Sequence, residues 1–317
     1  MVNWVTFIDI SLSGLGLGAL YALVAMGFSL IYKVTGVLNF AQGQIAMVGA
    51  YGVVIFGTAT VLPAAIPAWT AVLVTVLLGL VLGLALERVV FRQFIGEPVL
   101  SVIIVTLALG SILEGVIFFL YGQNAQAYPS ALTLGGQLSL PLGTSMQAAY
   151  AVAVAIALVV VAVLMLFFRE TVTGSILRAS ASDEQAAMVL GVSIERTIAL
   201  AWTLSIAITA IGGILLATSS GGAAVSIENT GIIIFAAVVL GGLDSIPGAF
   251  IGSIVVGVLQ ELGSYYLVGG TAVYVPFTDI QANLGAGFGE ILPLVLLLVV
   301  ILVKPYGLFG TERIERL

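Results

Sequence analysis

Long apolar stretches separated by short polar segments make up most of this chain. No charged residue occurs over residues 34–86, 115–168 or 197–227. A helix of about 20 apolar residues spans the hydrocarbon core of a bilayer with its backbone hydrogen bonds made internally. We therefore predict an all-α integral membrane protein, a polytopic bundle of about eight or nine transmembrane helices in a single transmembrane domain over residues 1–317. The predicted spans cover residues 11–32, 38–57, 68–86, 98–121, 148–168, 197–219, 231–243, 248–268 and 284–303.

Composition narrows the function further. Of 317 residues, 61% are hydrophobic and 8% charged, whereas a soluble domain carries about 25% charged residues. The chain has no His and no Cys, which removes the commonest zinc ligands, thiolate nucleophiles and imidazole proton relays. Its two lysines, Lys33 and Lys304, do not follow a phosphate-binding glycine loop. We expect no enzyme activity, no bound cofactor or metal and no nucleic-acid partner. Membrane lipid is an expected contact.

The basic residues indicate an orientation. If all nine spans cross, every Lys and Arg falls on one side, which the positive-inside rule assigns to the cytosol. The protein is then expected in the cell membrane with its N-terminus outside and its C-terminus inside. Residues 122–147 become an external segment, expected to form a small hairpin or loop that either docks a partner or only connects its neighbours. Residues 169–197 and the tail 304–317 become cytosolic.

Two of the predicted spans are poor continuous helices. Residues 38–57 contain amides and a glycine near their start, and residues 231–243 provide roughly 20 Å of helix against a core of about 30 Å. We predict that both are broken. Because they are five spans apart they would run in opposite directions, which is typical of inverted repeats around a transport pathway.

Polar side chains in these broken segments are candidates for that pathway. Neutral amides could relay a zwitterion without holding it tightly, and the alternative is that they tie neighbouring helices together by hydrogen bonds. The candidates are Asn39, Gln42 and Gln44 from the first segment and Asp244 and Ser245 from the second, although Asp244 could instead simply lie at the cytosolic edge.

The longest cytosolic segment contains a predicted short helix at residues 183–190. Ser182 and Gln185 form a pair of the capping-box type, and Gly191 is a helix stop. The helix would present Met188, Val189 and Leu190 outside the membrane, either to a partner protein or to the lipid headgroups.

At this point the chain resembles a known family. The segment QAAMVLG (residues 185–191) resembles the E-A-A-x-x-x-G element of ABC importer permeases, with Gln185 in place of Glu. The run GLGLGALYALVAMGFSLIYKVTGVLNFAQGQIAMVGAY is similar to the shorter of the two Liv-type permeases of branched-chain amino acid ABC importers. LERVVFRQFIG, FAAVVLGGLDSIPGAFIGSIVVG and KPYGLFG agree with it in order, so the resemblance covers nearly the whole chain.

The resemblance implies a heteromeric importer. It implies a homologous second permease, two cytosolic ATPase subunits that bind ATP and Mg²⁺, and an external substrate-binding protein. It also implies that the ATPases act through the short cytosolic helix, by way of Asp183, Glu184, Gln185, Ala186, Ala187 and Gly191. The expected substrates are branched-chain amino acids, with urea or short amides as the alternative within this type.

A different class of function is also open. Glu114, Glu261 and Glu290 lie at or near membrane depth, where a carboxyl group is a candidate for binding protons or sodium. An ion-coupled secondary transporter would use such groups and need no ATPase. Uptake driven by an ion gradient without ATP would distinguish the two.

Overall fold

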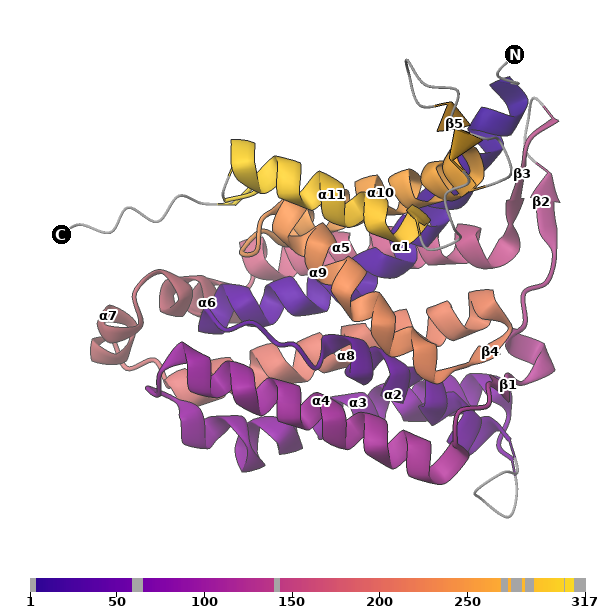
Figure 1. Cartoon of the computed structure of the whole chain (residues 1–317). Helices are drawn as coiled ribbons and strands as arrows, with labels where there is room; N and C mark the ends of the chain where they lie inside the picture. The colour runs from indigo at the N-terminus through magenta and orange to yellow at the C-terminus, as the bar shows by residue number, and fades with distance from the viewer. Residues whose placement is uncertain are drawn as a thin grey trace.

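The computed structural model describes residues 4–58, 65–139, 143–268, 273–274, 281–282, 288–304 and 306–310. It is a bundle of helices (Figure 1). Nine apolar helices in the described ranges match the predicted spans closely, although the first four residues of the last predicted span lie outside those ranges. They are α1 (Trp4–Thr35), α2 (Gln42–Gly57), α3 (Ala68–Val89), α4 (Val99–Tyr121), α5 (Ala148–Glu170), α8 (Ile194–Ser220), α9 (Thr230–Gly241), α10 (Ile246–Gly263) and α11 (Phe288–Val303).

Shorter elements connect these helices. The 3₁₀ turns are η1 (Phe91–Phe94), η2 (Ser130–Leu132) and η4 (Val225–Asn229), and a π-helical turn, η5 (Ser264–Val268), follows α10. Two short helices, α6 (Val172–Ser182) and α7 (Glu184–Val189), lie between α5 and α8. The strands are β1 (Gln126–Ala127), β2 (Gln137–Ser139), β3 (Ser145–Gln147), β4 (Gly222–Ala223), β5 (Val273–Tyr274) and β6 (Gln281–Ala282).

The two segments predicted to be broken are short helices. Among the described residues, six helices are long and apolar enough to cross a membrane, whereas α2 and α9 are shorter. With 16 and 12 residues they extend about 24 and 18 Å. The chain before α2 is extended after Gly36, whose φ is +67°, and the chain after α9 turns at Gly242, whose φ is +109°. These glycines adopt left-handed backbone that ends a helix.

Successive apolar helices alternate in direction across the bundle (Figure 1). Consequently four basic residues lie at one end of the bundle. They are Lys33 at the end of α1, Arg88 at the end of α3, Arg169 at the end of α5 and Arg196 at the start of α8. We call this the basic end, and it also carries α6 and α7. The opposite end, which carries β2 and β3, is called the hairpin end.

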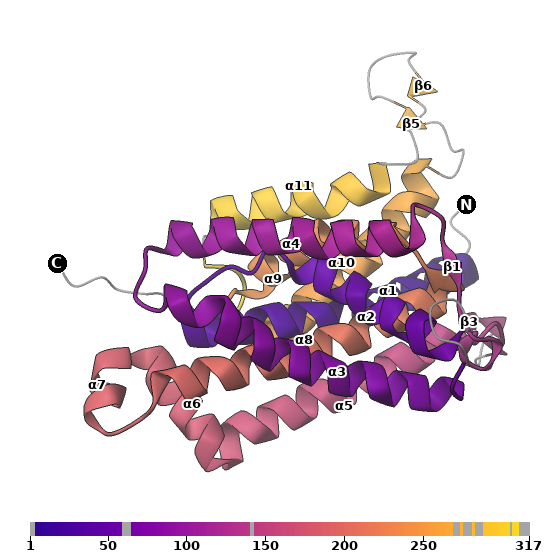
Figure 2. The same cartoon turned by 90° about the horizontal axis from the view of Figure 1, so that it is seen from below.

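Two helices form the centre of the bundle. The most apolar windows of α1 and α8 are 89% and 72% buried, against 22–28% for α3, α4 and α5. Figure 2 shows α1 and α8 running through the middle, with α3, α5 and α11 along the outside. Small residues permit close packing, since Gly14 and Gly18 of α1 lie directly against the backbone of α10. The outer helices expose apolar side chains, as expected for helices that contact lipid.

The helix contacts agree with two related halves. If the second half repeats the first with an offset of five spans, each of the first four spans has a counterpart: α1 corresponds to α8, α2 to α9, α3 to α10 and α4 to α11. In the structure α1 packs along α10, and its counterpart α8 packs along α3. Similarly, α2 contacts α3 and α4, and α9 contacts α10 and α11. Equated helices run in opposite directions (Figure 1), which is the arrangement of the predicted inverted repeats.

The predicted hairpin is present at the hairpin end. Strands β2 and β3 pair antiparallel, with Leu138 opposite Met146, and β1 pairs antiparallel with β4. Asp9 of α1 fastens this hairpin, because its Oδ1 accepts a hydrogen bond of 2.8 Å from the backbone N–H of Ser145. Tyr128 donates to the carbonyl of Ala50 over 2.8 Å, and burial raises the pKa of its hydroxyl. The segment is therefore anchored to α1 and α2.

Candidate functional site

The extended segment between α1 and α2 leads into a buried network of amides. Asn39 Nδ2 donates to Gln42 Oε1 over 2.7 Å, and Asn39 Oδ1 accepts from the backbone N–H of Ala41 over 3.1 Å. Gln42 Nε2 donates to Thr209 Oγ1 of α8. Asn39 is 1% exposed and Gln42 is 2% exposed. These two side chains therefore tie α2 to α8, and they also form part of the wall of a cavity.

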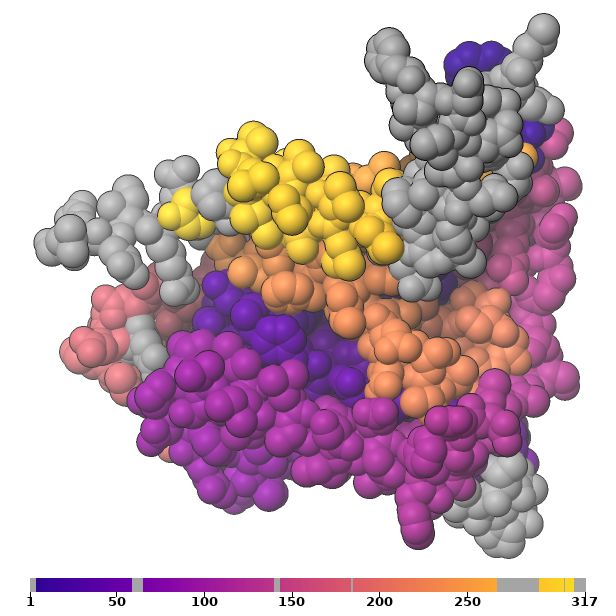
Figure 3. Space-filling view, viewed as in Figure 1, coloured from indigo at the N-terminus to yellow at the C-terminus, as the bar shows by residue number. Residues whose placement is uncertain are grey.

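That cavity has a volume of about 230 Å³ and lies between the start of α2 and the start of α9. Gln44, Glu228 and Asn229 supply further polar wall, and Phe28, Phe40 and Phe235 supply apolar wall. One buried oxygen each of Gln44 and Glu228 has no hydrogen-bond partner among the described residues. In Figure 3 the early part of the chain forms the floor of a hollow bordered by α4 and α9. A polar molecule entering here would find free acceptors.

Glu228 is a site residue that the sequence interpretation did not single out. Its side chain lies near those of Glu114 of α4 and Gln44. Two carboxyl groups close together at membrane depth could hold a cation between them. The signal in the sequence was slight: Glu228 is the single acidic residue between Glu195 and Asp244, and it directly precedes an apolar run.

Another predicted acid, Glu261, does not line this cavity. Glu261 lies in α10 near Tyr150 of α5. Glu290 lies in the first turn of α11, and its side chain is outside what the structure describes. Glu114 and Glu261 are thus not part of one cluster, and the prediction for Glu290 lies outside the described side chains.

Asp244 and Ser245 are also separate from the amides. They lie at the basic end, where Lys33 Nζ donates to the Asp244 carbonyl over 2.9 Å. Ser245 Oγ accepts from the backbone N–H of Gly248 over 3.1 Å and so caps α10. Neither residue lines the cavity at Asn39 and Gln42. Their proposed pathway role stays a prediction.

The short helix at the basic end is present as α7, but its cap differs from the prediction. Asp183, not Ser182, is the N-cap, and its Oδ1 accepts from the backbone N–H of Ala186 over 2.9 Å. The reason is that α6 extends through Ser182, whose hydroxyl donates to the Arg178 carbonyl over 3.0 Å. Gln185 consequently lies at the second helical position and forms no capping box with Ser182.

The predicted stop at Gly191 is confirmed. Its φ is +85°, its N–H donates to the Met188 carbonyl over 2.9 Å, and Val192 N–H donates to the Ala187 carbonyl over 3.0 Å. This is the Schellman arrangement, which requires a left-handed residue after the helix. The helix α7 therefore has a fixed end as well as a fixed start.

The exposed side of α7 is apolar. Val189 and Leu190 are 87% and 83% exposed, and Met188 is half exposed, whereas Ala187 is buried. Gln185 and Ala186 are exposed as well, and nothing is described for the Glu184 side chain. We call Met188, Val189 and Leu190 the apolar tip.

A second helix supports the apolar tip. The sequence interpretation did not foresee α6, which packs against α5, α1 and α8 as well as α7. Thr171 Oγ1 caps its start by accepting from the Gly174 N–H over 2.9 Å. Arg178 donates from the middle of α6 to the Phe168 carbonyl at the end of α5. The helix α6 therefore connects α7 to the central helices α1 and α8.

The fold and these features define a helical membrane transport subunit, and comparison with known proteins gives its family. Residues 10–303 match the family model described as the branched-chain amino acid transport system permease component. The chain belongs to this family of permeases.

Known permeases match this chain over nearly its full length. The high-affinity branched-chain amino acid transport system permease LivH of Escherichia coli K12 is 28% identical, covering 98% of this chain and 97% of that protein. BraD of Pseudomonas aeruginosa is 26% identical, covering 96% of this chain and 96% of that protein. The probable LivH of Methanocaldococcus jannaschii is 30% identical, covering 94% of this chain and 91% of that protein. These relatives are named as transport permeases, so the chain is a transport component and not an enzyme.

One solved structure has the same fold. PsaBC from Streptococcus pneumoniae in complex with Fab matches with a TM-score of 0.51, covering 96% of this chain and 97% of that chain at 14% identity. At this identity the likeness concerns the fold alone.

Proposed function

We propose that the chain is the membrane permease subunit of an ATP-driven ABC importer for branched-chain amino acids. The support is its family, together with the apolar tip, which a partner at the basic end could cover. In this proposal the basic end faces the cytosol, with the N-terminus outside and the C-terminus inside. An external binding protein delivers the amino acid to the hairpin end.

The apolar tip is the observation that carries the ATP-driven part of the proposal. Two ATPase subunits, which hold ATP and Mg²⁺, would contact α7 through Gln185, Ala186 and the tip. Asp183 and Gly191 keep this helix rigid at its two ends. Coupling requires that the ATPases bind α7 differently in their ATP-bound and free states, because only differential affinity shifts a conformational equilibrium. Glu184 and Ala187 complete the proposed contact.

The amide-lined cavity is the proposed central part of the pathway. It opens toward the hollow between α4 and α9, where a homologous second permease would cover it (Figure 3). Gln44 has a free buried oxygen there, whereas Asn39 and Gln42 use their polar atoms within the network. Asp244 and Ser245 at the basic end would line the exit to the cytosol.

Reconstitution tests this function. The chain would be coexpressed with the second permease and both ATPases, placed in vesicles and supplied with binding protein. We expect uptake of labelled leucine with ATP and Mg²⁺, and none with a non-hydrolysable ATP analogue. Competition by valine and isoleucine, but not by urea or acetamide, would support the substrate class. Uptake at the same rate with and without nucleotide would refute the proposal.

One observation favours the ion-coupled alternative. Glu228 and Glu114 lie near each other, and a pair of neighbouring carboxyl groups is one way in which a membrane carrier could bind a proton or cation. In the same vesicles, a proton or sodium gradient without ATP would then drive uptake. The Glu114→Gln variant would lose this gradient-driven uptake under the alternative, and would keep ATP-driven uptake under the importer proposal.

A further inference from the structure

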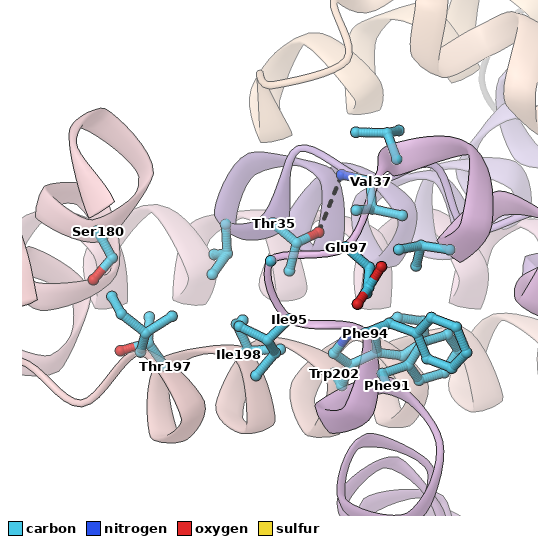
Figure 4. A pocket seen from close by; sticks show the side chains of 15 residues that line it. Thr35, Val37, Phe91, Phe94, Ile95, Glu97, Ser180, Thr197, Ile198 and Trp202 are labelled. Carbon is cyan, nitrogen blue, oxygen red and sulfur yellow. Dashed lines mark hydrogen bonds between the residues drawn. The ribbon is translucent and has the colours of Figure 1, made fainter. Parts of the chain in front are cut away.

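A second cavity lies at the basic end, apart from the amide-lined cavity. Its volume is about 230 Å³, below the roughly 300–1,000 Å³ of pockets for drug-sized ligands, so it suits a compact molecule. Four segments form its wall: the end of α1, the η1 connector with the start of α4, α6 and the start of α8. Figure 4 shows side chains from these segments converging on one space.

One part of this wall is polar. Ser180 of α6 is 7% exposed, and its hydroxyl has no hydrogen-bond partner among the described residues. Glu97 adds an exposed carboxylate, with no ion pair recorded for it within the described ranges. The wall also includes Val34 and Thr35, where α1 ends and where the helix dipole is negative. A carboxylate beside the C-terminal end of a helix favours a cation.

The remaining wall is apolar. Phe91 and Trp202 stack with ring centroids 3.8 Å apart, and Val37, Val99 and Ile198 contribute aliphatic surface. In the view of Figure 4 the Glu97 carboxylate lies over these rings, and Ser180 and Thr197 lie toward the other side of the cavity. We propose that this cavity binds a compact branched aliphatic molecule that carries an ammonium group, either an aliphatic amino acid or the corresponding amine.

Binding here has a consequence that rests on the proposed function. The cavity joins α6, which supports α7, to the extended segment that leads to Asn39 and Gln42. If ATP-driven transport moves α6 and α7 relative to that segment, a ligand that contacts both opposes the movement. Because the cavity is at the basic end, its ligand comes from the cytosol. Accumulated amino acid would thus slow its own uptake.

Tryptophan fluorescence reports the binding without any transport partner. The chain has three tryptophans, and the other two, Trp4 and Trp69, are 74% and 64% exposed and do not line this cavity. The double variant Trp4→Phe, Trp69→Phe leaves Trp202 as the reporter. We expect L-leucine and isopentylamine to change its emission saturably in detergent micelles, and 4-methylpentanoate, which lacks the amine, to have no effect.

Comparing the affinities of leucine and isopentylamine shows whether the natural ligand is an amino acid or an amine. Tighter binding of leucine supports a free amino acid, and tighter or equal binding of isopentylamine supports an amine. A response to 4-methylpentanoate as strong as that to leucine would overturn the ammonium assignment, as would no response to any of the three.

Matched variants locate the site. In the reporter background Glu97→Gln is expected to weaken the affinity about tenfold, the effect of losing one charge-assisted hydrogen bond. Glu170→Gln, which removes an exposed carboxylate paired with Arg169 outside the cavity, should leave it unchanged. Equal affinities for both variants, with unchanged elution and emission of the free protein, would refute the site.

Vesicles test the regulatory consequence separately. With the full importer, leucine loaded inside should slow ATP-driven uptake, and Glu97→Gln should shift this inhibition to about tenfold higher internal leucine. Failure of all uptake would count against the importer proposal, while the fluorescence titration would still decide the binding site. If internal leucine binds saturably to the cavity but does not slow ATP-driven uptake, the proposed regulation is refuted.

Discussion

A Cβ atom placed on Gly231 would lie 3.1 Å from the Cα of Gly43, so the starts of α9 and α2 meet with no room for a side chain between them. These are the two short helices, and the related halves place them at equivalent positions. The contact also borders the cavity that Gln44 and Glu228 line. Packing at this one point therefore sets the shape of the proposed pathway.

Substitution of Gly43 tests this contact. A Cβ on Gly43 would strike the Glu228 carbonyl oxygen and lie 3.1 Å from Gly231 Cα. We expect Gly43→Ala to lower the free energy of unfolding by about 1–3 kcal/mol, as overpacking does. The measurement is loss of the monodisperse elution peak with temperature in detergent. The control is Gly115→Ala in α4, where no atom lies within 4 Å. Equal melting of both variants would contradict the tight contact.

The amides of α2 should separate into a structural and a transport role. Gln42→Leu would leave Asn39 and Thr209 without their partner, and we expect a loss of about 1–3 kcal/mol of stability. Gln44→Leu removes a side chain whose oxygen is unpaired, so thermal stability should be kept while uptake falls. Elution after heating and leucine uptake in vesicles measure the two effects. The reverse pattern would show that Gln42 is the transport residue.

Gly191 should be needed for its backbone conformation and not for its small size. No atom lies within 4 Å of a Cβ built there, yet the φ of +85° disfavours most side chains. Gly191→Val is expected to displace the apolar tip and abolish ATP-driven uptake, with membrane insertion kept. Gly191→Asn, which tolerates this conformation, should retain most uptake. Loss of uptake in both variants would point to a steric role at an interface.

The apolar tip should be required for ATPase binding. Val189→Asp places a charge on a side chain that is 87% exposed, so the fold should be unaffected. Copurification of the ATPase subunits is expected to fail, because a carboxylate would have to be buried in the contact. The matched control is Val172→Asp, at a residue of α6 that is 78% exposed and outside the tip. ATPases retained by Val189→Asp would exclude the tip as their contact.

The helical architecture was predictable because membrane spans are long and strongly apolar. Hydrophobicity located every described span to within a few residues except the start of α1, and the amides and glycines marked α2 and α9 as interrupted. Which helices pack together was not predictable, since Gly18 of α1 has no local signal for its contact with α10. Such pairings depend on shape complementarity between distant segments. The helix α6 was missed because its sequence is only moderately apolar.

The candidate site was predictable in part. The amides Asn39, Gln42 and Gln44 do line one cavity, but the sequence could not tell which of them are engaged in hydrogen bonds. Asp244 was grouped with them by an assumed symmetry of the two halves, and it lies at the basic end instead. Glu228 was overlooked because a lone acid beside an apolar run resembles a span boundary.

The apolar tip also has a consequence for the protein before assembly. A newly made copy without its companions would display Val189 and Leu190 at the end of the bundle, on a helix that cannot fold them away because both of its ends are fixed. Chaperones and proteases in the cell act on exposed hydrophobic surface of this kind. If ATPase subunits cover the apolar tip as proposed, the abundance of the chain would depend on the supply of those subunits.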